Sequence, residues 1–225
     1  PVIMQVDSAA PVVSAQCWVA TGSQHENQFA GSGLSHLLEH MVFKGTNSFT
    51  GAELATTVNS MGGQWNAYTS FDRTVYYIDG PSASCDTFLR VLFELVFQPR
   101  FPEADFETER DVIRREIDMG KDDPDSAASE LLFRTFFQHD LRRHPVIGYR
   151  RCFDALTYDN MVEYHRSRYC PSNSILVLSG DFDPVNAMSV LEEMGGSVPF
   201  RPLAPTIAQT EPRQLGQRRA RMPFA

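Results

Sequence analysis

The chain has 225 residues, of which 42% are hydrophobic and 21% are charged, a composition typical of an ordinary globular protein. Its formal net charge of −8 argues against a nucleic-acid partner, because such proteins present basic surfaces. No apolar run is long enough to span a membrane, and the 4 cysteines are scattered without a Cys-x-x-Cys pair, so they predict neither a zinc knuckle nor a redox compartment.

The first part of the sequence predicts two strands, a loop and two helices. Residues 2–6 and 12–20 are β-branched runs separated by a turn sequence, which predicts a pair of strands joined by a turn. A polar loop over residues 21–33 leads into a helix that contains residues 36–40. Residues 50–53, Thr-Gly-Ala-Glu, form a capping box and predict the start of a second helix.

The remainder predicts a β-hairpin, further helices and one more strand. Residues 64–70 and 73–79 read as two strands around a tight turn. Apolar spacing and cap residues predict the helices. Four of these helices span residues 84–97, 102–119, 127–137 and 159–169, and a last helix begins at Asp183. A buried strand is predicted over residues 174–179. Helices segregated from hairpin-like strands indicate an α+β fold, in which a mostly antiparallel sheet is covered by helices.

Both ends of the sequence have the character of a cut chain. It begins on Pro1 in a strand-like segment without an initiator methionine, and it ends in a loose basic tail. We expect residues 1–198 to form the domain, and residues 199–225, where proline and polar residues dominate, to form a linker. The compartment is undetermined for the same reason, so cytoplasmic, periplasmic and organellar locations all stay open.

The segment His36-Leu37-Leu38-Glu39-His40 carries the strongest functional signal. On a helix, His36 and His40 lie one turn apart on the same face, while the leucines gather on the opposite, packing side. Two nitrogens and a carboxylate on one face suit a divalent zinc ion with a bound water. A third ligand is then required elsewhere. The alternative is a surface helix with unrelated polar residues, and we expect His25 and His165 to be surface residues, not ligands.

The helix expected over residues 102–119 contains two glutamates, Glu109 and Glu116, within an otherwise apolar arc. Buried carboxylates are costly unless they are paired or bind a metal. Seven residues apart, the two project from the same side, two turns from each other. Glu116 is a candidate third ligand, and Glu109 is better placed to orient a histidine N–H. The alternative for either is an ion pair with an arginine such as Arg73 or Arg110.

Taken together, these motifs resemble those of the pitrilysin/insulinase-type zinc peptidases, the inverzincins. Residues 33–46 are similar to the zinc-helix signature of that family, and Glu109 and Glu116 match its distant pair of glutamates. Further similarities are Asn66-Ala67-Tyr68-Thr69 after a Gly-Gly pair, residues 144–148 and residues 169–173. The resemblance covers nearly the whole chain and implies the N-terminal half of a fold related to LuxS and the processing peptidases, an α/β sandwich repeated in pairs.

The resemblance also implies roles for individual residues. His36, His40 and Glu116 would be the ligands of Zn²⁺, Glu39 would be the general base, and Glu109 would support the site from behind the ligands. The domain of residues 1–198 would then be a zinc-dependent endopeptidase that hydrolyses extended peptides with metal-activated water.

Asn66 and Ala67 would lie on an edge strand that pairs with the peptide substrate, although without the resemblance a plain sheet strand is the simpler interpretation. The arginine and tyrosine that complete the family's active site have no counterpart here, so we expect a C-terminal half or a partner subunit to supply them. A homodimer also stays open. In isolation the half is expected to have weak activity or none. The alternative function is a non-catalytic scaffold subunit of a processing-peptidase-like complex. The presence of all three expected ligands, His36, His40 and Glu116, and of the expected base, Glu39, argues against it.

Overall fold

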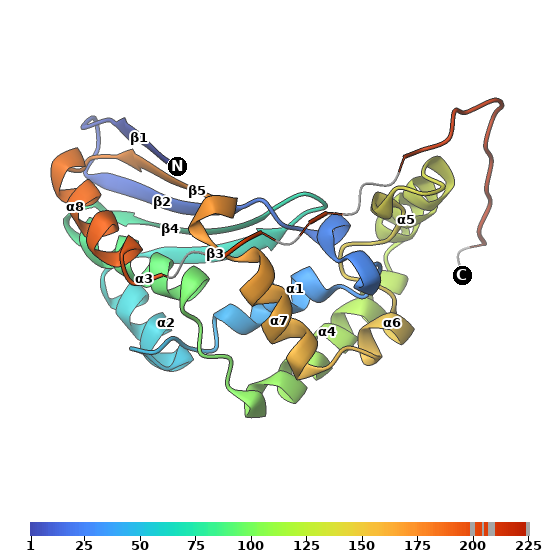
Figure 1. The fold of residues 1–225 in the computed structure, drawn as a ribbon, viewed down its shortest axis with the longest axis horizontal. Helices are drawn as coiled ribbons and strands as arrows, with labels where there is room; N and C mark the ends of the chain where they lie inside the picture. The colour runs from blue at the N-terminus through green and yellow to red at the C-terminus, as the bar shows by residue number, and fades with distance from the viewer. Residues whose placement is uncertain (199–200, 204, 207–209, 224–225) are drawn as a thin grey trace.

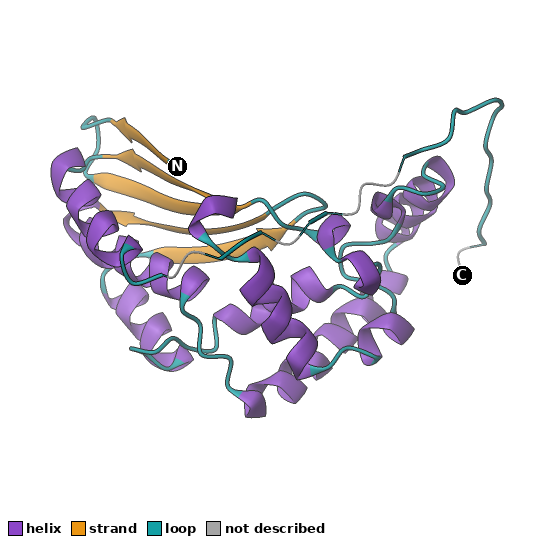
Figure 2. Cartoon of the chain, in the orientation of Figure 1, coloured by secondary structure: helices purple, strands orange, loops and turns teal. Residues whose placement is uncertain are grey.

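The computed structural model describes residues 1–198, 201–203, 205–206 and 210–223. A five-stranded sheet in the order β1-β5-β2-β4-β3 forms one layer, and the helices gather on one face of it (Figures 1 and 2). The strands are β1 (Val2–Val6), β2 (Val12–Val19), β3 (Gln64–Thr69), β4 (Thr74–Pro81) and β5 (Ser174–Gly180). Three of the four pairings are antiparallel and β1 with β5 is parallel, so the predicted α+β fold with a mostly antiparallel sheet is confirmed.

The turn after β1 does not bring β1 beside β2, contrary to the expected pair. β5 lies between them: Val2 pairs in parallel with Leu176, and Ala15 of β2 pairs in antiparallel with Leu178. A local pattern predicts that a segment is a strand but not which strand it pairs with, and here the partner comes from the other end of the chain. β5 is also less buried than predicted, because Ile175 is 41% exposed and only Ser174 and Leu178 of the strand are buried.

The helices follow the predicted order with shifted ends. They are α1 (Leu34–Val42), α2 (Gly51–Ser60), α3 (Cys85–Phe97), α4 (Glu103–Lys121), α5 (Pro124–Phe136), α6 (Arg150–Asp154), α7 (Tyr158–Arg168) and α8 (Pro184–Gly195). The capping box of α2 is formed, since Thr50 N–H donates to Glu53 at 2.7 Å and Thr50 Oγ1 accepts from Glu53 N–H at 3.3 Å. α5 begins earlier than predicted because Asp123 caps it, and α6 is a short helix that was not among the predicted ones.

The core lies between the sheet and the helices. Alternate side chains of β2 point inward, and Ala15 and Cys17 are fully buried. The predicted packing side of α1 faces the same core, with Leu37, Leu38 and Met41 all at 0% exposure. This packing fixes the rotation of α1 about its axis, so the side that carries the histidines is turned away from the core.

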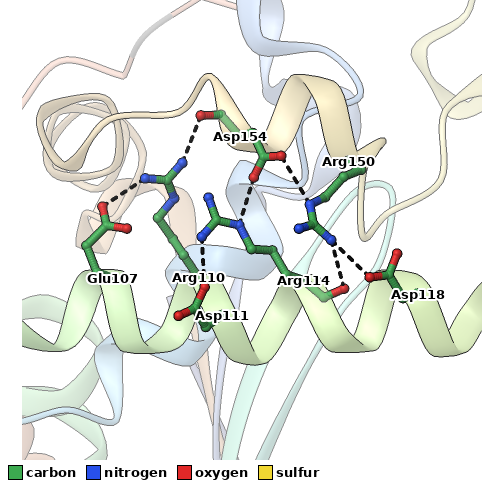
Figure 3. Close-up of polar contacts among 7 residues, drawn as sticks. All are labelled: Glu107, Arg110, Asp111, Arg114, Asp118, Arg150 and Asp154. Carbon is green, nitrogen blue, oxygen red and sulfur yellow. Dashed lines mark hydrogen bonds and ion pairs between the residues drawn. The ribbon is translucent and has the colours of Figure 1, made fainter.

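α4 is braced by α6 on the side away from its two central glutamates. Asp154 accepts from Arg114 Nε at 2.8 Å and from Arg150 Nε at 3.1 Å, and its carbonyl accepts from Arg110 at 2.8 Å (Figure 3). Arg150 also pairs with Asp118 of α4 at 3.0 Å. Single exposed ion pairs contribute about 0–1 kcal/mol each, but a connected network holds the two helices in one relative position.

Pro199, where the predicted linker begins, lies outside the described residues. Described parts of the segment contact the domain: the carbonyl of Pro205 accepts from Asn27 at 3.3 Å, and Glu211 accepts from the backbone N–H of His139 at 2.6 Å. None of the described helices combines the length and the apolar character that crossing a membrane requires.

Candidate metal centre

Two helices bring together three side chains of the types that bind metal ions. His36 and His40 come from α1, and Glu116 comes from α4. Glu116 Oε2 lies 3.8 Å from His36 Nε2 and 3.7 Å from His40 Nε2, and the two imidazole centroids are 4.7 Å apart. Among the described residues this is the one group of histidine, cysteine and acidic side chains with such geometry.

The donor set and its spacing fit a zinc ion. Tetrahedral zinc with bonds of about 2.0–2.1 Å separates its ligand atoms by about 3.3 Å. The distances from Glu116 to the two histidines, 3.8 and 3.7 Å, are a few tenths of an ångström wider, which small side-chain rotations would close. Two nitrogens and one carboxylate oxygen leave a fourth position open, and the Glu116 side chain is 37% exposed, so solvent reaches the group.

Glu109 orients the ring of His40. Its Oε2 lies 3.0 Å from His40 Nδ1, which turns Nε2 of that ring towards Glu116. Glu109 is 6% exposed and also forms an ion pair with Lys44. Burial acts in the opposite direction, but the hydrogen bonds from His40 and Lys44 lower the pKa of Glu109 below its usual value. The group therefore stays a carboxylate.

The arginine partners considered for the two glutamates are engaged elsewhere. Arg110 pairs with Glu107 at 2.8 Å, and Arg73 pairs with Asp72 at 2.9 Å. The cation on Glu109 is Lys44, which sequence reasoning missed. Lys44 follows His40 by four residues, about one helical turn, so its side chain lies near that of His40. This spacing is the signal that could have identified it.

The two histidines have different surroundings. Burial, with a smaller contribution from His40, lowers the pKa of His36 to about 4, so this imidazole is neutral near pH 7 and able to bind a metal. Burial also acts to lower the pKa of His40, but the Glu109 hydrogen bond and the nearby carboxylates raise it above its usual value. Nδ1 of His36 is buried and has no hydrogen-bond partner among the described residues.

Glu39 lies beside the three-residue group but is not part of it. Its Oε2 accepts a hydrogen bond of 2.5 Å from Thr69 Oγ1, at the end of β3. Burial raises the pKa of Glu39 above its usual value, although the Thr69 hydrogen bond acts in the opposite direction. A half-buried carboxylate with a raised pKa next to a metal position is suited to accept and release a proton.

Asn66 and Ala67 lie on β3, an edge strand that pairs only with β4 among the described strands. The N–H of Ala67 donates to Asn66 Oδ1 at 2.9 Å, so it is directed to the free edge and not to β4. The Thr69–Glu39 contact joins this strand to α1. A backbone edge able to accept another strand therefore runs past the carboxylate of Glu39.

A cavity of about 900 Å³ opens beside Glu116. Its wall is largely apolar, and it includes Phe71, Ile117, Phe133 and Ile147. Because Glu116 lines this cavity and also belongs to the three-residue group, the cavity opens next to that group.

Sequence reasoning also misjudged two buried polar residues. His165, expected on the surface, is 5% exposed, and its Nε2 lies 2.9 Å from the carbonyl of Val96. Glu26 comes from a segment expected to be a polar loop, yet it is 1% exposed. No local pattern marks either residue as buried, because the groups that cover them come from distant parts of the chain.

The family model described as Insulinase (Peptidase family M16) matches residues 1–148, and the model described as Peptidase M16 inactive domain matches residues 155–223. The chain is 30% identical over 180 residues to an uncharacterized zinc protease of Mycobacterium leprae, covering 80% of this chain and 40% of that protein. It is 29% identical over 180 residues to an uncharacterized zinc protease of Bacillus subtilis, covering 80% of this chain and 44% of that protein.

The fold is similar to the crystal structure of a protease from Helicobacter pylori, with a TM-score of 0.90 and 26% sequence identity. That similarity covers 96% of this chain and 53% of the Helicobacter chain. The chain thus spans less than half the length of the two curated relatives and about half of this structural one.

Proposed function

Because the chain belongs to the M16 family of peptidases, and the relatives named above are zinc proteases, we propose that it is the zinc-binding catalytic half of an endopeptidase that cleaves extended peptides. The observation that carries this proposal is the convergence of His36, His40 and Glu116 beside the half-buried carboxylate of Glu39. An unrelated polar patch would have no reason to place these four side chains together.

In this proposal His36, His40 and Glu116 hold the zinc ion. When bound, the ion supplies a Lewis acid that activates water and polarises the carbonyl of a peptide bond. Glu109 holds His40 in the tautomer that presents Nε2 to the metal, because its carboxylate accepts the proton on Nδ1. Lys44 balances the charge of Glu109 and keeps it ionised.

Glu39 is the general base in this scheme. Its carboxylate accepts a proton from the attacking water and passes it to the nitrogen of the leaving amine. The raised pKa of Glu39 favours the first step, since a weakly acidic carboxyl group takes up a proton more readily. The Thr69 hydroxyl, 2.5 Å away, holds the carboxylate in position.

The substrate binds in an extended conformation along β3. The free edge at Asn66 and Ala67 offers backbone hydrogen bonds, and the cavity beside Glu116 accepts a side chain. Backbone pairing does not depend on side chains, so the peptidase is expected to accept many sequences. The curated relatives are more than twice as long as their match to this chain, which supports a C-terminal half or partner subunit that supplies a substrate-binding arginine and tyrosine.

A non-catalytic scaffold subunit is the second candidate. It is favoured by the match of residues 155–223 to the model described as an inactive domain. All the residues proposed for catalysis and zinc binding lie within residues 1–148, which match the peptidase model instead. We therefore prefer the catalytic function.

The test is hydrolysis of a quenched fluorescent peptide by the chain alone and together with a C-terminal half. We expect the two halves together to cleave the peptide, and this cleavage should stop when a chelator removes zinc and return when one equivalent of zinc is added. Cleavage that persists after complete zinc removal would contradict the mechanism. A zinc-loaded complex of both halves that cleaves no peptide would favour the scaffold function.

A further inference from the structure

The two histidines of the proposed zinc site are held in different ways. A hydrogen bond of 3.0 Å to Glu109 fixes the ring of His40. The ring of His36 has no such partner among the described residues, since its Nδ1 is buried and unbonded. The direction of His36 therefore depends on where the first turn of α1 is placed.

The first turn of α1 lacks a cap of its own. Gly33, at the N-cap position, has φ of 73° and no side chain that could accept a hydrogen bond. The exposed N–H groups of a first helical turn need acceptors. Here the acceptor is the carboxylate of Glu26, whose Oε1 accepts from Ser35 N–H at 2.9 Å and whose Oε2 accepts from Ser32 Oγ at 3.4 Å. Ser35 is the residue directly before His36.

Glu26 is unusual for a carboxylate. It is 1% exposed, and no ion pair joins it to a cation among the described residues. Burial raises the pKa of its carboxyl group to about 7. A buried carboxyl group without a cation is costly, and the positive end of α1 is the feature that compensates for it. The first turn of this helix therefore provides the environment that stabilises the buried carboxyl group of Glu26.

Two further contacts hold the first turn in place. An added Cβ on Gly33 would lie 2.1 Å from the carbonyl oxygen of Ile147, so the turn packs directly on that backbone. On another side, the hydroxyls of Ser35 and Tyr164 are 2.9 Å apart. Glu26 is thus one of three contacts that locate the turn, and it is the contact made to the helix backbone itself.

We propose that Glu26 is a positioning residue for the metal site: its carboxyl group fixes the first turn of α1 and thereby directs His36 towards the zinc ion. Glu26 touches neither the metal position nor the substrate edge. Glu26 positions His36 through the backbone of the helix, whereas Glu109 positions His40 through a hydrogen bond to its ring. This inference rests on the proposed assignment of His36 as a zinc ligand.

The test measures zinc affinity by competition with a chelator, together with the visible spectrum of the cobalt-loaded protein, in three variants. Glu26→Ala removes the cap and should weaken zinc binding about 10–100-fold, the range seen when a ligand's supporting group is lost. Glu26→Asp keeps the charge but is too short to reach Ser35, and should also weaken it. Glu26→Gln keeps an oxygen for the Ser35 N–H and should stay within about fivefold of wild type. The cobalt spectrum should change in the first two variants.

Two controls separate the possible failures. His36→Ala must lose zinc; if it does not, the ligand assignment is wrong, and the proposed function fails with it. Glu192→Ala removes an exposed carboxylate from α8 and should leave zinc binding unchanged. If His36→Ala loses zinc while Glu26→Asp and Glu26→Ala bind it as wild type does, the positioning role is refuted. Should Glu26→Ala fail to fold, the order of the Asp and Gln variants decides: equal affinities, or tighter binding by Asp, would overturn the proposal.

Discussion

Thr69 and Glu39 are joined by a hydrogen bond of 2.5 Å, which connects the edge strand β3 to helix α1. The donor is the last residue of the strand proposed to receive substrate, and the acceptor is the proposed general base. One contact therefore sets both the direction of the base and its distance from the free edge.

Replacing Glu39 with glutamine should abolish peptide hydrolysis and leave zinc in place. Glutamine has the shape of glutamate but cannot accept the proton, so kcat should fall by about 10²–10⁴. Metal content by atomic absorption and peptide cleavage are measured on the same sample. Glu163→Gln, a change at an exposed site on α7, serves as the control. Retained turnover in a zinc-loaded Glu39→Gln protein would remove Glu39 from the role of base.

Thr69→Val should shift the pH dependence of the reaction without loss of zinc. The Thr69 hydrogen bond stabilises the ionised form of Glu39 and so lowers its pKa. Without it the pKa rises further, and the acidic limb of the kcat/KM profile should move to higher pH. A limb that stays in place, or one that moves to lower pH, would show that Thr69 does not act on the base.

Glu116→Ala and Glu109→Ala should weaken zinc binding to different degrees. Loss of Glu116 removes a proposed ligand, so zinc should not be retained after dialysis against buffer without metal. Loss of Glu109 leaves His40 unoriented and should weaken binding about 10–100-fold. Glu107→Ala, at an exposed position on the same helix, is the matched control. Full zinc occupancy in Glu116→Ala would move the third ligand elsewhere.

Ala67→Pro should weaken substrate binding without affecting the metal. The Ala67 N–H is directed to the free edge of β3, where it donates to Asn66 Oδ1. A proline there removes this hydrogen bond and with it one possible donor to the substrate, but no hydrogen bond to β4. One neutral hydrogen bond contributes about 0.5–1.5 kcal/mol, which predicts a KM raised about three- to tenfold. An unchanged KM in a folded, zinc-loaded variant would argue against pairing at this edge.

The buried His165 should make the stability of the protein depend on pH. Burial lowers its pKa to about 4 in the folded state, below the value of about 6.5 in the unfolded chain. As the pH falls below 6.5 the unfolded chain gains a proton that the folded protein does not, so the free energy of unfolding should decrease, by about 1–2 kcal/mol at pH 5. In His165→Gln this part of the loss should vanish. Urea unfolding at pH 7.5 and pH 5 measures it, and equal losses in both proteins would contradict the assignment.

Much of the fold could be predicted because it depends on local spacing. Periodic apolar residues predicted α1 with Leu37 and Leu38 inside, and the Thr50–Glu53 pair predicted the start of α2. The placement of Glu109 and Glu116 on one side of α4 also followed from helical geometry alone. Each of these depends on residues within a few turns of one another, where backbone geometry leaves few alternatives.

The sequence by itself determined which helix faces carry the imidazoles and the carboxylates, since those positions follow from 3.6 residues per turn. Only the tertiary structure decided that β5 separates β1 from β2, that Lys44 and not an arginine meets Glu109, and that Glu26 is buried at the first turn of α1. The physical reason is that no periodic pattern in the sequence links the segments that these contacts join. Packing of the folded chain alone selects the partners.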